Sequence, residues 1–185
     1  MDFIGNIKEL AEKALSQKDL LDTEEATKNA LIMPFIQELG YNVFDPQEVR
    51  PEYTADIGTK KGEKVDYAIF RDDSPAILLE CKALGVALDS SHRNQLFRYF
   101  SAIAKVRFGV LTNGLMYQFY TDLDHKNRMD EKPFLEFNLS NIQEPLVEEL
   151  QKFTKANFNA DTIISRAEDL KYTREIKHLL AEEYN

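Results

Sequence analysis

Residues 65–82 have the sequence VDYAIFRDDSPAILLECK, in which two apolar segments flank a polar stretch. The polar stretch, residues 71–75, has the composition of a hairpin turn, so the segments on either side are predicted to be neighbouring strands. The run AILLECKAL, residues 76–84, is mostly apolar, which is typical of a strand buried on both faces. The sequence therefore predicts a core sheet that contains this pair of strands.

Two charged side chains interrupt the second of these strands. Side chains alternate along a strand, so Glu80 and Lys82 are expected to project from one face while Cys81 points to the other. A charged pair beside an apolar run is costly to bury unless it has a compensating partner or a function. The alternative is that the strand emerges into water at Glu80, where an exposed ion pair would contribute only about 0–1 kcal/mol.

An aspartate interrupts the first strand in the same way. Antiparallel pairing about the turn could bring Asp66 close to Glu80 or Lys82, provided that the side-chain parity matches the register. Two carboxylates in such proximity repel unless a cation lies between them, and Mg²⁺ is the natural candidate because it takes one or two carboxylates and keeps several waters. Lys82 could then orient or help deprotonate an attacking water, or stabilise negative charge on a phosphodiester.

The helix predicted over about residues 90–105 carries further polar candidates. Gln95 and Tyr99 are spaced i, i+4 and so lie on one face of it. The amide of Gln95 and the hydroxyl of Tyr99 are suited to contact phosphate or to hold Lys82. Apolar residues lie on more than one side of this helix, so core packing is the alternative for Tyr99.

Helical periodicity predicts two helices before the strands, over residues 3–16 and from about residue 23 to residue 39. Thr23 fits the N-cap of the second helix, and Gly40 fits its C-terminal end. Pro34 lies inside this pattern and lacks a backbone donor, so a kink or a break is expected there.

Period-2 patterns and turn residues predict the remaining strands, and helical patterns return near the C-terminus. The expected strands cover residues 41–44, 107–114, 115–122 and 133–139, and the expected helices cover residues 141–155 and 160–183. This order favours an α/β fold with a mixed central β-sheet flanked by helices and with extra C-terminal helices. We expect a domain over residues 1–140 and a C-terminal helical extension over residues 141–185, packed on the domain or appended to it.

The net charge of −9 argues at first against a nucleic-acid ligand, because phosphate binding depends on Lys and Arg. The charge is unevenly distributed. Residues 57–128 hold 11 basic and 8 acidic side chains, whereas residues 1–56 hold 5 and 12, and residues 129–185 hold 7 and 12. Arg93 and Arg98 belong to the basic block and are candidates for contacts with DNA, although a chance partition of surface charge would look the same.

The cysteine content and the N-terminus indicate the compartment. A single cysteine, Cys81, cannot form an internal disulfide, which suits a reducing cytosol. The N-terminal residues carry charges every few positions, unlike a signal peptide, and no apolar run approaches the ~20 residues of a membrane span. A cytoplasmic protein with no membrane contact is expected.

The order of the candidate residues resembles the PD-(D/E)XK nuclease superfamily, with its Asp, Glu-x-Lys and Gln-x-x-x-Tyr elements after a helix-borne Glu. A narrower likeness covers roughly residues 22–120 and is to the N-terminal nuclease domain of type I restriction enzyme R subunits and related stand-alone proteins. It rests on five short motifs in order with compatible spacing. They are LIMPFIQELGYNV, to which Glu24-Glu25-Ala26-Thr27 leads, then VDYAIF, LLECKA, NQLFRY and VLTNG.

The resemblance implies a restriction-endonuclease-like fold and a site that binds Mg²⁺, with Mn²⁺ as a substitute. It implies that the metal is bound by Asp66, Glu80 and the carbonyl of Cys81, that Lys82 acts on the attacking water, that Gln95 and Tyr99 support substrate or lysine, and that Glu24 is an auxiliary acid with Glu25 as its rival. Val65 stands where the superfamily's name has a proline, which matters little because the carboxylate is what binds.

The function implied is a Mg²⁺-dependent endonuclease that hydrolyses DNA phosphodiester bonds. The alternative is a catalytically silent nuclease-like module that binds DNA or other proteins. The chain has no GxxxxGK[ST] loop, so DNA translocation is not expected of it. The partners implied are DNA and the motor or specificity subunits of a restriction system.

Overall fold

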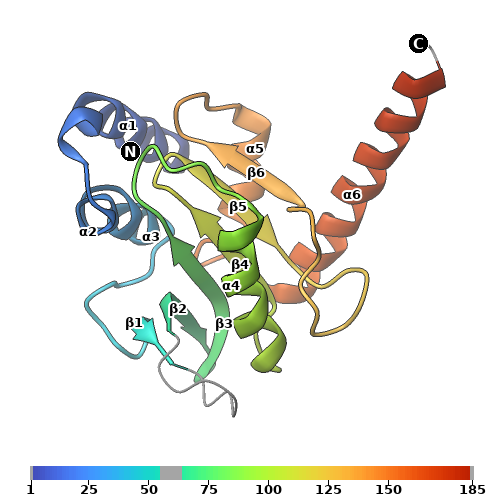
Figure 1. Cartoon of the computed structure of the whole chain (residues 1–185), viewed down its shortest axis with the longest axis horizontal. Helices are drawn as coiled ribbons and strands as arrows, with labels where there is room; N and C mark the ends of the chain where they lie inside the picture. The colour runs from blue at the N-terminus through green and yellow to red at the C-terminus, as the bar shows by residue number, and fades with distance from the viewer. Residues whose placement is uncertain (1, 55–63, 184–185) are drawn as a thin grey trace.

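The computed structural model describes residues 2–54 and 64–183 and contains a six-stranded sheet in the order β1-β2-β3-β4-β5-β6 (Figure 1). In this sheet β3 pairs with β4 in parallel, and the other neighbouring pairs are antiparallel. The predicted α/β fold with a mixed central sheet is confirmed. The strands are β1 (Val49–Tyr53), β2 (Val65–Arg71), β3 (Ser74–Cys81), β4 (Phe108–Thr112), β5 (Met116–Tyr120) and β6 (Leu135–Asn138).

The hairpin between β2 and β3 forms where it was predicted. Its turn residues Asp72 and Asp73 have φ values of 49° and 58°, the left-handed region that short polar residues tolerate. The register aligns Tyr67 with Leu79, with an irregularity nearer the turn. The strand ends far from the turn are therefore adjacent.

Helices cover both faces of the sheet (Figure 1). On one face α4 (Ser90–Ala102) packs Leu96 and Phe100 against strand residues such as Leu78. This helix also makes the crossover that the parallel β3–β4 pair requires. The other face is covered by α1 (Phe3–Gln17), α3 (Met33–Glu38) and α5 (Glu144–Gln151).

The second predicted helix has an irregular centre. It consists of α2 (Glu24–Thr27), a π-helical segment η2 (Lys28–Ile32) and α3, and it follows a short 3₁₀ segment η1 (Lys18–Leu20). Pro34 is in the first turn of α3, where a missing N–H is tolerated. The expected distortion at the proline is thus a widened turn immediately before it rather than a break.

The predicted strand over residues 41–44 is wrong, and β1 forms later, from Val49. Tyr41 and Val43 are buried and Phe44 is 77% exposed, so the segment has alternating burial without strand pairing. The segment turns because the Asn42 side chain accepts the backbone N–H of Phe44. Its alternating pattern imitates a strand.

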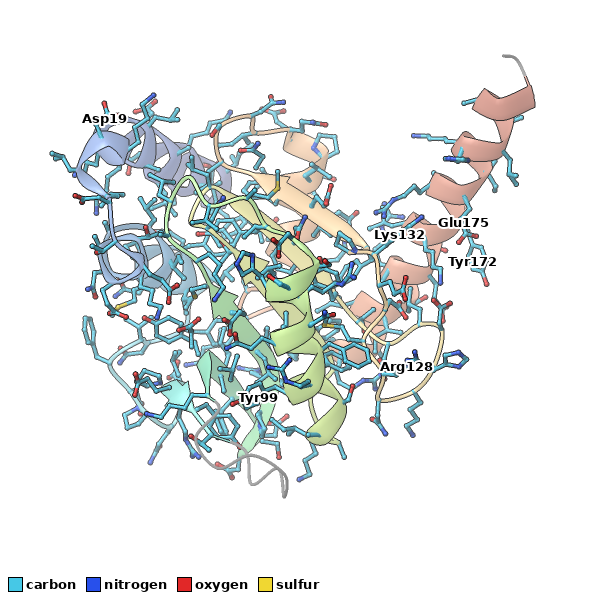
Figure 2. All side chains as sticks on the ribbon, viewed as in Figure 1. Asp19, Tyr99, Arg128, Lys132, Tyr172 and Glu175 are labelled. Atoms are coloured by element: carbon cyan, nitrogen blue, oxygen red, sulfur yellow. The ribbon has the colours of Figure 1, made fainter. Side chains whose placement is uncertain are left out.

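The C-terminal helices are α5 and α6 (Ala160–Glu183), with α5 shorter than predicted. Phe153, Ile163 and Ala167 are buried in the core cluster that includes α1 and α3. The later part of α6 extends away from the sheet, and Tyr172 and Glu175 lie on it (Figure 2). Where the domain ends and the extension begins stays a prediction. Within residues 2–54 and 64–183 no helix is long and apolar enough to cross a membrane.

Candidate active site

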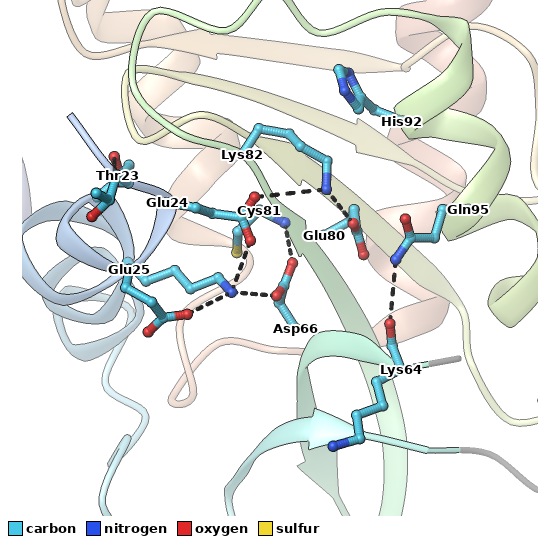
Figure 3. Close-up of polar contacts among 12 residues, drawn as sticks. Thr23, Glu24, Glu25, Lys64, Asp66, Glu80, Cys81, Lys82, His92 and Gln95 are labelled. Atoms are coloured by element: carbon cyan, nitrogen blue, oxygen red, sulfur yellow. Dashed lines mark hydrogen bonds and ion pairs between the residues drawn. The ribbon is translucent and has the colours of Figure 1, made fainter. Parts of the chain in front are cut away.

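The site is built at the ends of β2 and β3 that lie away from their hairpin turn. The antiparallel register pairs Tyr67 with Leu79, and its extension by one residue places Asp66 across from Glu80. One carboxylate oxygen of Asp66, Oδ2, accepts the backbone N–H of Cys81 at 2.7 Å. The two carboxylate residues that the sequence predicted to be neighbours therefore share one end of the sheet (Figure 3).

Glu80 and Lys82 form a buried ion pair. Lys82 Nζ lies 2.5 Å from Glu80 Oε1, and the side chains are 2% exposed for Glu80 and 15% exposed for Lys82. The alternative of an exposed ion pair is therefore wrong. Cys81 lies between them in the chain and packs into the core cluster with α1 and α3. Burial raises the pKa of its thiol well above the ordinary value.

The second oxygen of Glu80, Oε2, is buried and has no hydrogen-bond partner among the described residues. A buried carboxylate oxygen without a partner is costly in the charged form. Burial raises the pKa of the Glu80 carboxyl to about 7. The carboxylates of Asp66 and Glu24 raise it too, and the ammonium of Lys82 opposes them. The site thus contains one acceptor that the described part of the chain leaves unused.

A second lysine, Lys28 at the start of η2, lies among the carboxylates. Its side chain is 11% exposed, and its Nζ lies 2.5 Å from Asp66 Oδ1, 3.0 Å from Glu24 Oε1 and 3.1 Å from Glu25 Oε1. Burial disfavours its charge, but hydrogen bonds to Asp66 and Glu24 outweigh burial and raise the pKa of the ammonium. Lys28 is not among the residues that the sequence predicted.

Glu24 connects the two lysines. Its Oε1 contacts Lys28, and its Oε2 lies 4.0 Å from Lys82 Nζ. The side chain of Glu25 is 76% exposed and contacts Lys28 from the periphery. Of the two rival acids, Glu24 is therefore the one whose carboxylate lies between the two lysines of the site (Figure 3).

Local contacts fix the helix that carries Glu24 and Lys28 against the sheet. The hydroxyl of Thr27 accepts the backbone N–H of Leu84 at 2.9 Å and donates to the carbonyl of Thr23 at 3.0 Å. Gly114 in the turn between β4 and β5 packs against the same helix, because a Cβ there would lie 2.8 Å from Thr27 Cγ2. The site therefore depends on contacts between distant parts of the chain.

The remaining predicted residues lie on α4. The amide of Gln95 donates to the carbonyl of Lys64 at 3.3 Å, just before β2 (Figure 3). Tyr99 is fully buried in the core cluster beneath α4, as its core-packing alternative describes. Arg93 Nη1 donates to the carbonyl of Glu131, and Arg98 Nη1 donates to that of Asn94. Their predicted roles toward substrate stay predictions.

Residues 2–54 and 64–183 contain no group of three or more His, Cys, Asp or Glu side chains arranged to hold a metal ion. Two lysines lie among the carboxylates of the site. The ammonium of Lys28 contacts Asp66 and Glu24, and that of Lys82 contacts Glu80. The donor set still suits a hard cation, since it offers carboxylate oxygens and the unused Oε2 of Glu80.

Comparison with known proteins identifies a family. A family described as "Type I restriction enzyme R protein N terminus" matches residues 23–133. The matched region contains the strands β1 to β5, the helix α4 and all the residues of the site. Neither a curated protein nor a solved structure matches the chain.

Proposed function

Because the match covers more than half of its 185 residues, this chain belongs to the family of type I restriction enzyme R protein N-termini, and on that premise we propose that it is a Mg²⁺-dependent endonuclease acting on DNA. The proposal includes membership of the PD-(D/E)XK superfamily. It also includes DNA and the motor or specificity subunits of a restriction system as partners.

The observation that carries the proposal is the buried carboxylate of Glu80. It lies beside Lys82, its Oε2 has no partner among the described residues, and Asp66 lies across from it on β2. A fold gains no stability from burying two acids in this way, so the arrangement favours a function.

In the proposed mechanism Asp66, Glu80 and the carbonyl of Cys81 would hold Mg²⁺, with Mn²⁺ as a substitute. The metal, when bound, would supply Lewis-acid stabilisation of the charge that develops on the phosphodiester. Lys82 is held by Glu80 and points its ammonium into the site, where it orients the attacking water and stabilises the negative charge.

Five further residues have supporting roles in the proposal. Glu24 lies 4.0 Å from Lys82 and serves as the auxiliary acid that helps to fix its position. Gln95 on α4 supports the substrate or the lysine, and Tyr99, fully buried beneath α4, supports them from within the fold. Arg93 and Arg98 on the same helix contribute phosphate contacts, since both carry guanidinium groups on a partly exposed surface.

One observation favours the second candidate, a silent module that binds DNA or protein. Asp66 is already neutralised by Lys28, and the described residues hold no assembled metal cluster. A module that has lost turnover would keep the fold and the basic block while its carboxylates pair internally.

The test is a plasmid-nicking assay with Mg²⁺ or Mn²⁺ against a chelator control. The wild type is expected to nick only with metal, and Asp66→Asn is expected to lose ~10²-fold or more of the activity. Asp73→Asn is the matched control, because Asp73 is exposed in the hairpin turn and Asn also tolerates its positive φ. DNA binding without metal-dependent nicking would support the silent module instead.

A further inference from the structure

Lys28 occupies an unusual place for a lysine. It is 8% exposed as a residue, and its ammonium joins carboxylates from two elements, Asp66 on β2 and Glu24 on α2. It begins the π-helical segment η2, and such segments often occur at functional sites. A buried ammonium is stable only with paired carboxylates, so Lys28 and Asp66 depend on each other.

From this geometry we infer that Lys28 is the resident cation of the site: it neutralises Asp66 and Glu24 while no divalent ion is bound, and a divalent ion displaces it from Asp66. The inference rests on the proposed function, because it assumes that Asp66 binds metal. It adds a competition between an ammonium of the protein and the metal for the same carboxylate.

The charges explain why the two cations compete. Lys28 hydrogen-bonds Asp66 Oδ1, and the Cys81 N–H takes Oδ2, so both oxygens of this carboxylate already have donors. A divalent ion on Asp66 would stand close to the ammonium, and like charges at such distances in a partly buried site repel strongly. The ammonium must move for the metal to bind well.

The carboxylate of Glu25 can pair with the ammonium of Lys28 when the metal displaces it from Asp66. Its carboxylate is 3.1 Å from Lys28 Nζ, and its side chain is 76% exposed. A small rotation of the lysine toward Glu25 would strengthen the ion pair that it already forms with Glu25 while releasing Asp66. The role of Glu25 is therefore to hold the ammonium of Lys28 after it leaves Asp66. This role differs from that of the auxiliary acid, which belongs to Glu24.

The competition predicts that removing the ammonium improves metal binding. Lys28→Met is expected to bind Mn²⁺ and Mg²⁺ about 10-fold more tightly than wild type, because the competing charge has gone. Lys28→Arg keeps the charge and is expected to bind close to wild type. Lys155→Met is the control for the loss of a paired lysine, since Lys155 forms a close ion pair with Glu48, at 2.7 Å, outside the site.

Titration calorimetry with Mn²⁺ on the whole chain, together with melting in metal and in chelator, tests the inference. The metal-induced rise in melting temperature is expected to be larger for Lys28→Met than for wild type. Equal or weaker metal binding by a folded Lys28→Met would overturn the inference, because Lys28 would then hold Asp66 in place for the metal. If wild type and Lys28→Met both bind no metal, the proposed function fails as well.

A second variant decides the matter if Lys28→Met does not fold. Glu25→Gln alters an exposed side chain and removes the place to which the lysine moves, so metal binding is expected to weaken about 3-fold. Asp22→Asn, an exposed acid just before the same helix, is its control and is expected to bind as wild type does. Metal binding by Glu25→Gln equal to that of Asp22→Asn would overturn the inference.

Discussion

Glu80 and Lys82 contact each other, yet their removal is expected to have different effects. Lys82→Ala should still bind metal, because the carboxylates of Asp66 and Glu80 remain, and should bind it as well as or better than wild type. Cleavage should fall by ~10²-fold or more, the usual scale for the loss of acid–base help. Glu80→Ala should lose metal binding and cleavage together.

Parallel calorimetry and nicking assays check this pair of variants. Lys126→Ala removes an exposed lysine from the loop before β6 and serves as the control for lost charge. If Lys82→Ala cuts DNA at the wild-type rate while the wild type is active, Lys82 is a structural ion-pair partner and its assignment fails.

The sequence predicted the strand residues of the site because charge inside an apolar run is visible without a structure. Asp66, Glu80 and Lys82 each interrupt such a run. Lys28 was missed because its spacing from Glu24 and Glu25 indicates only ordinary pairs within one helix. Its contact with Asp66 depends on how that helix packs on the sheet, and a single sequence does not specify this packing.

At the scale of elements, the turn between β4 and β5 holds the site helix in position. Gly114 has a φ of +85°, and a Cβ there would lie 2.8 Å from Thr27 and 3.0 Å from Leu31. Gly114→Ala is therefore expected to destabilise the protein by about 2–4 kcal/mol, which combines left-handed strain with overpacking. Urea unfolding measures the loss.

Gly85 is the matched control for this prediction. Its φ is +86°, nearly the same, but a Cβ there would meet nothing within 4 Å. Gly85→Ala is expected to cost only the backbone strain, about 1–2 kcal/mol. Equal losses for the two variants would show that the contact with the helix contributes nothing.

Elements were predicted well where the signal is local. The hairpin between β2 and β3 and the Asn113–Gly114 turn both formed, because the turn residues specify the chain reversal. β1 was missed because VRPEY contains a proline and has only one buried residue, so its sequence shows no strand pattern. Its backbone forms a strand because it pairs with β2. Strand formation there is a tertiary effect.

For the whole molecule, the charge distribution predicts DNA binding that depends on salt. A protein with a net charge of −9 can bind DNA only through a local basic surface, so affinity should fall steeply as salt displaces phosphate contacts. Titrations of labelled duplex DNA with Ca²⁺ in place of Mg²⁺ measure binding without cleavage. Arg98→Ala is expected to lower the salt dependence, whereas Lys18→Ala, an exposed residue after α1, should not.

An absence of affinity even at low salt would count against DNA as the ligand. It would leave protein partners as the function of the exposed surface. Equal salt dependence for Arg98→Ala and its control Lys18→Ala would instead show that the DNA contact does not lie at Arg98 on α4.

The edge strand β1 also affects how the protein behaves at high concentration. β1 lies at the edge of the sheet, and an edge strand can recruit the strand of another molecule through its unpaired backbone groups. Pro51 in β1 has no N–H to donate, and Glu52 beside it has a φ of 47°, which departs from extended geometry. The edge therefore offers a poor template for intermolecular pairing, and the sheet is protected against strand-by-strand aggregation along that side.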